Sequence, residues 1–249
     1  MSFIVNLNGK PQIYVHGYDL GTYGRTYALG FEQDAIDVTA FADVARRRII
    51  GNQTVTLRYD GLFDSTGTGP HTAINDLRGT QRTISVWPDG MSVGATGAAI
   101  LRANAQMYRP AGNMGEVLSL GFDITSDARY DVVYSYDTKI ATSTTGQYTS
   151  PTYDRGASST AGGVFFVHIF TCSASGGNTR WTLRWQDATA DISGSFAAVD
   201  GIGAYQANSG TILATYQTST GNVFRYNRFR ASLDADSGNI TFVAGFGGR

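Results

Sequence analysis

Short stretches of the chain alternate between apolar and polar residues, which is the pattern of β-strands that bury one face. In 54–59, valine, leucine and tyrosine alternate with threonine and arginine, and the same period runs through 100–108 and 117–124. The stretch 164–170 is apolar at successive positions, which predicts a central strand with both faces buried. Four later strands are predicted at 180–186, 211–217, 223–233 and 240–246.

The alternation also predicts which side chains share a buried face. In 100–108 these are Leu101, Ala103, Ala105 and Met107. In 117–124 they are Leu118, Leu120, Phe122 and Ile124. In 180–186, Trp181 and Trp185 share a face with Leu183, and we expect them in a core rather than exposed for stacking on sugars.

One short helix is predicted between Pro70 and Gly79. Proline suits the first helical position, and Ala73, Ile74 and Leu77 fall on one face. Glycine favours the left-handed conformation that ends a helix. A helix this short needs a sheet to dock on.

The chain is therefore expected to be mainly β, in two domains. The first covers 1–130 and carries the helix on its flank, and the second is a β-sandwich over 164–249, with short strands and Gly- and Asn-rich turns. Between them, 131–163 is rich in Ser, Thr, Gly and Tyr and has almost no aliphatic period. This segment is predicted to be a linker or a long loop.

Charge and cysteine content exclude some classes of protein. Lys plus Arg is 19 and Asp plus Glu is 20, a net charge of -1, which argues against the broad basic field of a protein that grips DNA. The single cysteine excludes an intramolecular disulfide, so the fold does not depend on an oxidising compartment and a cytosolic location fits. The N-terminus lacks the features of an export signal and no apolar run reaches about 18 residues, so we expect no membrane insertion.

No motif predicts catalysis or a cofactor. His16, His71 and His168 have no ligand at metal-binding spacing and are expected to be structural. The acidic stretch 234–239 lacks the Glu of a calcium loop and predicts a hairpin turn. No Gly-x-Ser-x-Gly elbow occurs in the sequence, and no pair of carboxylates stands out for acid–base chemistry. We therefore expect no catalytic residue, no metal and no cofactor, and a protein that is not an enzyme.

One stretch of the first half combines both signs of charge: Glu32, Asp34, Asp37, Asp43, Arg46, Arg47 and Arg48. A head-to-tail contact between copies needs two different complementary surfaces on each subunit, and such contacts close into rings when the rotation allows. The alternative is a solvated loop whose arginines make no contact.

A set of motifs runs through about residues 3–127. It begins with the segment 37–51, which contains Asp-Val-Thr, then Phe-x-Asp, then an arginine-rich link to Ile-x-Gly. A strand ending in Gly61-Leu-Phe-Asp64, the predicted helix, and turns at 87–90, 94–97 and 112–115 follow in that order. In this order the set resembles the major tail tube proteins of long-tailed, siphophage-type bacteriophages. The resemblance implies a tail-tube-type β-sandwich or barrel with one flanking helix. It also implies stacked rings, commonly hexameric, whose inner strands form one continuous barrel and conduct the genome.

The resemblance assigns roles to the mixed-charge stretch. It implies a subunit interface at Asp37, Thr39, Phe41, Asp43, Arg46, Arg47, Arg48 and Ile49. It implies that Glu32 and Asp34 face the lumen, where acidic groups keep DNA from adhering. A two-residue period puts Glu32 and Asp34 on one strand face and Asp37 on the other.

The function implied is that of a structural virion protein, a tail tube subunit assembled in the host cytoplasm and located in the tail. Its implied partners are its own copies, the tape-measure protein, the tail terminator and tip proteins, and DNA in transient passage. The C-terminal sandwich is then an outward decoration domain, or a diverged second tube-like fold that gives trimeric rings of pseudo-sixfold symmetry. The alternative from another class is a carbohydrate-binding or adhesin-type virion surface protein.

Overall fold

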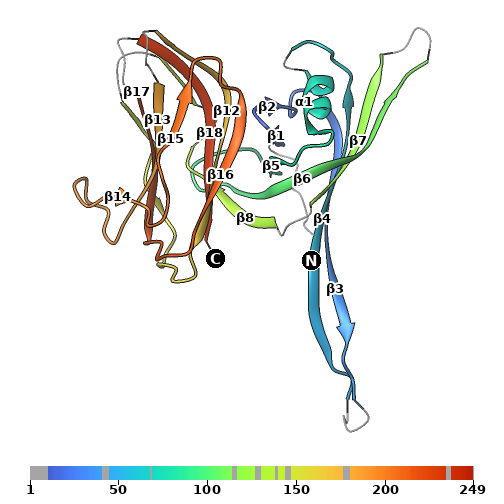
Figure 1. Ribbon diagram of the computed structural model, residues 1–249, viewed down its shortest axis with the longest axis horizontal. Helices are drawn as coiled ribbons and strands as arrows, with labels where there is room; N and C mark the ends of the chain where they lie inside the picture. The colour runs from blue at the N-terminus through green and yellow to red at the C-terminus, as the bar shows by residue number, and fades with distance from the viewer. Residues whose placement is uncertain are drawn as a thin grey trace. The chain divides into compact units, whose positions relative to one another are not determined.

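The computed structural model describes residues 11–40, 45–67, 69–113, 117–126, 130–137, 140–143, 147–175, 180–233 and 237–248, and these are mainly β-strand with a single α-helix (Figure 1). Contacts divide the chain into two units. The ribbon unit consists of Thr22–Arg82 and Ile100–Tyr130. The sandwich unit consists of Met1–Gly21, Thr83–Ala99 and Asp131–Arg249.

The ribbon unit is built on an antiparallel sheet in the order β3–β4–β7–β6. Its strands are β3 (Gly24–Asp37), β4 (Arg48–Leu62), β7 (Ser119–Ser126) and β6 (Thr96–Ala111), whose first residues belong to the sandwich unit. Alternation in β4 is as predicted, because Val55, Leu57 and Tyr59 are buried. Tyr59 stacks on Phe122 of β7 with ring centroids 4.7 Å apart.

The predicted helix is present as α1 (Pro70–Leu77) and lies against β7. Proline occupies the start of the helix, and Ala73, Ile74 and Leu77 are fully buried. Gly79 adopts a φ of +73°, the left-handed conformation predicted for the helix end. The local prediction for this element is confirmed.

In β6 and β7 the buried apolar face is shorter than the alternation predicted. Pairing of β6 with β7 shifts between Ala105 and Met107, and Met107 is exposed where unbroken alternation predicted burial. A bulge moves the residues after it to the other face of the sheet. Leu118 precedes β7 and is 39% exposed, so the expected buried face begins at Leu120.

The sandwich unit contains strands of two sheets. One sheet runs β16–β12–β18–β8–β6–β5–β1–β2, with β9 on β18. Its further strands are β1 (Gln12–Val15), β2 (Tyr18–Asp19), β5 (Arg82–Trp87), β8 (Tyr130–Ser135), β9 (Ile140–Ser143), β12 (Gly163–Ser175), β16 (Leu213–Ser219) and β18 (Ser237–Gly248). The central strand predicted at 164–170 is confirmed, because β12 lies between β16 and β18 and these residues are all buried.

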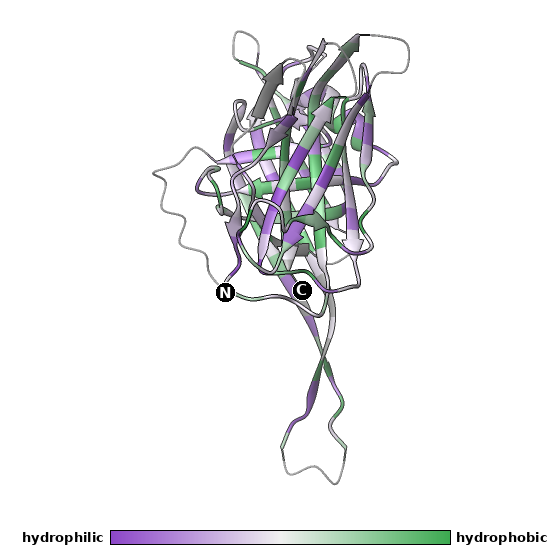
Figure 2. Cartoon of the chain, turned by 90° about the vertical axis from the view of Figure 1, so that its left-hand side faces the viewer, coloured by the Kyte–Doolittle hydropathy of each residue, from purple (hydrophilic) through white to green (hydrophobic). Residues whose placement is uncertain are grey.

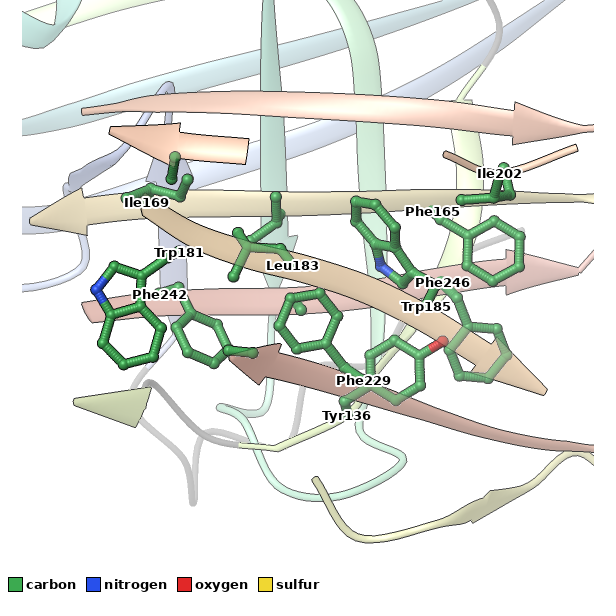
Figure 3. Close-up of a cluster of buried hydrophobic side chains, with 14 of the residues drawn as sticks. Tyr136, Phe165, Ile169, Trp181, Leu183, Trp185, Ile202, Phe229, Phe242 and Phe246 are labelled. Carbon is green, nitrogen blue, oxygen red and sulfur yellow. The ribbon is translucent and has the colours of Figure 1, made fainter. Parts of the chain in front are cut away.

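The second sheet is centred on β17 and β13. Its strands are β10 (Gln147–Thr149), β11 (Tyr153–Asp154), β13 (Arg180–Ala188), β14 (Ala197–Ala198), β15 (Tyr205–Asn208) and β17 (Tyr226–Leu233). Trp181, Leu183 and Trp185 point into an aromatic core with Phe229 and Phe242 (Figure 3). They are 1% exposed or less, which confirms that the tryptophans are core residues.

The segment 131–163, expected to be a linker or long loop, contributes strands to both sheets. Strands β8 and β9 pair with β18, and β10 and β11 pair with β17. Tyr134, Tyr148 and Tyr153 pack against the aromatic core, which holds these polar stretches in place. The two units also interleave along the chain, unlike the consecutive domains expected at 1–130 and 164–249. The division into domains at 1–130 and 164–249 with a linker between them stays a prediction.

Candidate assembly surface

The β3–β4 hairpin continues well past the end of β7. Its two strands pair from Gly24 with Gly61 to Asp37 with Arg48, whereas β7 pairs with β4 only over 56–62. The part beyond, residues 32–40 and 45–54, is called the distal ribbon here, and it extends away from β7 (Figure 1). Among the described strands, β3 pairs with β4 alone.

Hydrogen bonds organise the end of the distal ribbon. The backbone N–H of Val38 donates to the carbonyl oxygen of Arg47 over 2.9 Å, which extends the ladder past the strands. The carboxylate of Asp37 accepts from the backbone N–H and the hydroxyl of Thr39 at 2.9 and 2.5 Å. The hydroxyl of Thr39 accepts in turn from the backbone N–H of Arg47 at 2.9 Å. The two hydrogen bonds from Thr39 lower the pKa of the Asp37 carboxyl, so it stays charged.

Aliphatic side chains lie exposed beside these polar groups. Ile36 and Ile49 pair directly across the strands, and each is 52% exposed. Val38 is 42% exposed. Isoleucines that stay in water gain nothing from burial, and contiguous exposed apolar groups mark interaction sites.

The structure brings together most of the residues expected at an interface. Those described are Asp37, Thr39, Arg46, Arg47, Arg48 and Ile49, and all lie exposed at the end of the distal ribbon. Phe41 and Asp43 lie outside the described residues. Their role in an interface stays a prediction.

Glu32 and Asp34, expected to face a lumen, are exposed residues of β3. Glu32 pairs with Thr54, on the face opposite to the buried Val55. Asp34 lies where the pairing shifts, across from Gly51. A Cβ on Gly51 would lie 2.9 Å from the Cβ of Asp34, so the two strands approach closely here because residue 51 is glycine. Which of these carboxylates faces a lumen stays a prediction.

The outward face of the sheet carries an ion-pair group that sequence reasoning missed. Arg58 and Asp123 pair across β4 and β7, with Nε and Oδ1 3.7 Å apart. Arg109 on β6 lies 3.4 Å from the other oxygen of Asp123. The alternation of apolar and polar residues over 54–59 already predicted that Arg58 lies on the polar face of its strand. The ion-pair partners of Arg58 could not be predicted from the sequence, because they depend on the register of three strands.

No cluster of three or more His, Cys, Asp or Glu side chains suited to a metal ion occurs among the described residues. His168 is buried, with Nε2 2.9 Å from the hydroxyl oxygen of Ser85. Cys172 is also buried, which raises the pKa of its thiol to about 11. None of the described helices has the length and apolar character needed to cross a bilayer.

Comparisons with known proteins give structural likenesses only. No family model and no curated protein matches the sequence. The chain is similar to a chain in the virion of a native gene transfer agent particle, with 15% identity over 44% of this chain and 84% of that one and a TM-score of 0.37. It is similar to a chain in the tail of the empty particle, determined with C6 symmetry, with 15% identity over 49% and 92% and a TM-score of 0.39.

A third likeness covers more of the chain. The Dit protein of phage SPP1, a hub of the adsorption apparatus in phages that infect Gram-positive bacteria, matches 93% of this chain and 98% of its own length. The identity is 12% and the TM-score 0.30. At these identities and TM-scores the comparisons do not assign the chain to a family.

Proposed function

We propose that the protein is a structural subunit of a phage tail, which joins its own copies into rings stacked as the tail tube. The distal ribbon is the observation that carries the proposal. A two-stranded hairpin is marginally stable in water, and an exposed strand edge is a template for pairing with another chain. A ribbon that extends past β7 with aliphatic side chains in water is therefore suited to a partner.

The strand order supports ring closure between copies. In the order β3–β4–β7–β6 every neighbouring pair is antiparallel, and among the described strands β3 pairs with β4 alone, whereas β6 also pairs with β5 and β8. An even number of antiparallel strands leaves the two outer strands running in opposite directions. Ring closure then requires β3 of one copy to pair with the part of β6 in the next copy that β5 and β8 leave unpaired. Such a contact keeps the antiparallel pattern, and the two edges differ, as a head-to-tail contact requires.

The polar face of this sheet supports a conduit for DNA. It carries both signs of charge, because Arg58 and Arg109 accompany Asp123, and Glu32 extends the face along β3. A face without excess positive charge does not hold phosphates tightly. In the proposed ring this face lines the lumen, and DNA passes without stable binding.

The finer parts of the proposal follow the sequence resemblance. Rings are hexameric, the protein is not an enzyme, and the assembly site is the host cytoplasm before incorporation in the virion tail. The tape-measure, terminator and tip proteins are the remaining partners. The sandwich unit is carried as a decoration of the ring.

The test is assembly of an Ile36→Thr/Ile49→Thr variant. Threonine keeps the β-branched shape that suits a strand and removes the apolar contact, so the monomer should stay folded and assembly should fall severalfold. Negative-stain microscopy and sedimentation with the tape-measure protein as nucleator give the yield of rings and tubes. The matched control is Ile192→Thr/Ile212→Thr, two isoleucines that are 65% and 41% exposed in the sandwich unit.

Equal assembly by the ribbon variant would remove the distal ribbon from the interface. A wild-type protein that remains monomeric with the nucleator would contradict the ring itself. If that monomer is retained on a glycan column, the adhesin-type alternative is favoured.

A further inference from the structure

The outer face of the second sheet in the sandwich unit concentrates arginine. Alternation along β13 sends Trp181, Leu183 and Trp185 into the core, so the intervening residues face outward. Figure 2 views the chain from the side on which β13 and β17 lie in Figure 1, and hydrophilic and hydrophobic residues alternate along its strands. The outward basic residues, called the arginine face here, are Arg180, Arg184, Arg228 and Arg230.

Two of these arginines oppose each other directly. In the register of β13 and β17, Arg184 pairs with Arg230. Arg228 lies two residues along β17, on the same face. Like charges directly opposite each other destabilise a sheet. An anion bound between the two guanidinium groups would relieve this repulsion, so the arrangement suits anion binding.

Neutral amides, not carboxylates, accept hydrogen bonds from the arginine face. The Nε of Arg228 donates to the side-chain oxygen of Gln186 over 3.0 Å, and Arg230 donates to the side-chain oxygen of Gln147. Arg184 is exposed and makes no hydrogen bond or ion pair with the described residues. Amide partners orient a guanidinium without neutralising it, so the positive charge stays available.

Nearby carboxylates leave most of this charge in place. Asp154 is engaged by Arg225, which donates from Nε and one terminal nitrogen over 2.6 Å each. Asp191 lies near Arg228, and its effect is smaller than those of burial and of Arg230, which lower the pKa of Arg228. The arginine face is therefore locally positive in a chain of net charge -1.

The rest of the face offers hydroxyl and amide groups. Thr149 on β10 pairs with Arg230, and Thr182 on β13 pairs with Ser232 and with Gln206 on β15. Thr149 and Gln206 are exposed, whereas Thr182 is buried and its hydroxyl donates to the side-chain oxygen of Gln206 over 3.1 Å, which orients that amide. Such groups match the hydroxyls of a sugar, while guanidinium groups match carboxylate, sulfate or phosphate.

We propose that the arginine face binds an acidic polysaccharide, with Arg184 and Arg230 binding its anionic groups and the exposed Thr149 and Gln206 side chains contacting its hydroxyls. A polysaccharide fits better than duplex DNA, because tight DNA binding depends on many phosphate contacts and this face holds four arginines. The site lies outside the ribbon unit and does not depend on ring assembly.

The test compares the wild-type full-length chain with Arg184→Gln/Arg230→Gln on immobilised polymers. The polymers are alginate for carboxylates, dextran sulfate for sulfates, neutral dextran, and duplex DNA. We expect wild-type protein to bind at least one acidic polysaccharide and not dextran, with the double variant weakened about tenfold or more, since hydrogen bonds to charged groups are among the stronger ones. Comparison of alginate with dextran sulfate identifies the preferred anion.

Two further variants separate binding from folding. Arg25→Gln/Arg78→Gln removes the same charge from exposed positions of the ribbon unit and should bind as wild type. Arg184→Lys/Arg230→Lys keeps the charge but not the planar fork, and should bind with intermediate affinity. The proposal is overturned if wild-type protein binds neither acidic polymer, if the glutamine variant binds equally well, or if DNA binds more tightly than both polysaccharides.

Discussion

His168 shows what burial does to a single side chain in the sandwich unit. The ring is completely buried on β12, beside the rings of Phe166 and Tyr14, and bonded to Ser85. Burial, with a smaller contribution from the nearby His16, lowers its pKa from 6.5 to about 3. The imidazole is therefore neutral in the folded protein at neutral and mildly acidic pH.

This histidine makes the stability of the fold depend on pH. Below pH 6.5 the unfolded chain binds a proton at His168 that the folded chain does not, so the free energy of unfolding falls as pH decreases toward about 3. Between pH 6.5 and 5 the loss from this group is about 2 kcal/mol. Urea unfolding at pH 7 and pH 5 measures it.

The control is His168→Gln, whose amide can keep a hydrogen bond to Ser85 but does not titrate. Its loss of stability between the two pH values should be smaller than that of wild type by about the same 2 kcal/mol. For each protein the measured quantity is the difference between its own stability at pH 7 and at pH 5. A change in stability that is equal at both pH values therefore does not affect the result. Equal losses in both proteins would show that His168 does not contribute.

Elements of this fold begin and end for local reasons that can be tested singly. Gly79 follows α1 with a φ of +73°, and a Cβ placed there meets nothing within 4 Å. The glycine is therefore required by its backbone conformation and not by space. In the distal ribbon, by contrast, Gly51 is required by the close approach of Asp34.

Gly79→Ala should lower the free energy of unfolding by about 1 kcal/mol, because alanine disfavours the left-handed region. Gly67→Ala is the control, since a Cβ there also meets nothing within 4 Å and no positive φ applies. Its stability should be unchanged or slightly increased, because alanine restricts the unfolded chain. Urea midpoints of both variants provide the comparison, and equal midpoints would contradict the conformational argument.

In the proposed assembly, the arginines at the end of the distal ribbon are expected to contribute to the contact between copies. Arg46, Arg47 and Arg48 are exposed, and exposed charges contribute little to the stability of a monomer. At an interface, arginine is among the residues whose removal costs most. Folding and assembly should therefore respond differently to their loss.

Arg46→Ala/Arg47→Ala/Arg48→Ala should unfold within about 1 kcal/mol of wild type and give fewer rings and tubes by at least severalfold. The control removes three other exposed arginines, Arg78→Ala/Arg180→Ala/Arg184→Ala. Thermal unfolding and tube counts in micrographs separate the two effects. A normal tube yield from the ribbon variant would exclude these arginines from the subunit contact.

Many features of the fold could be predicted from residues that are close together in the sequence. The alternation over 54–59, the proline and glycine that bound α1, and the inward face of Trp181 and Trp185 all involve residues within one turn or one strand. The exposed cluster of the distal ribbon was also visible as a run of mixed charge. Period and backbone preference act over a few residues, so one stretch of sequence was enough to predict these features.

Pairing between distant strands was decided only in the folded chain. The bulge that exposes Met107, the ion pairs of Asp123, and Arg184 opposite Arg230 each depend on the register of separate segments. The strands formed from 131–163 likewise depend on tyrosines that find a core built by later residues. Alternation states which face of a strand is apolar, but it does not state which strand lies beside it, because that choice rests on packing summed over the whole unit.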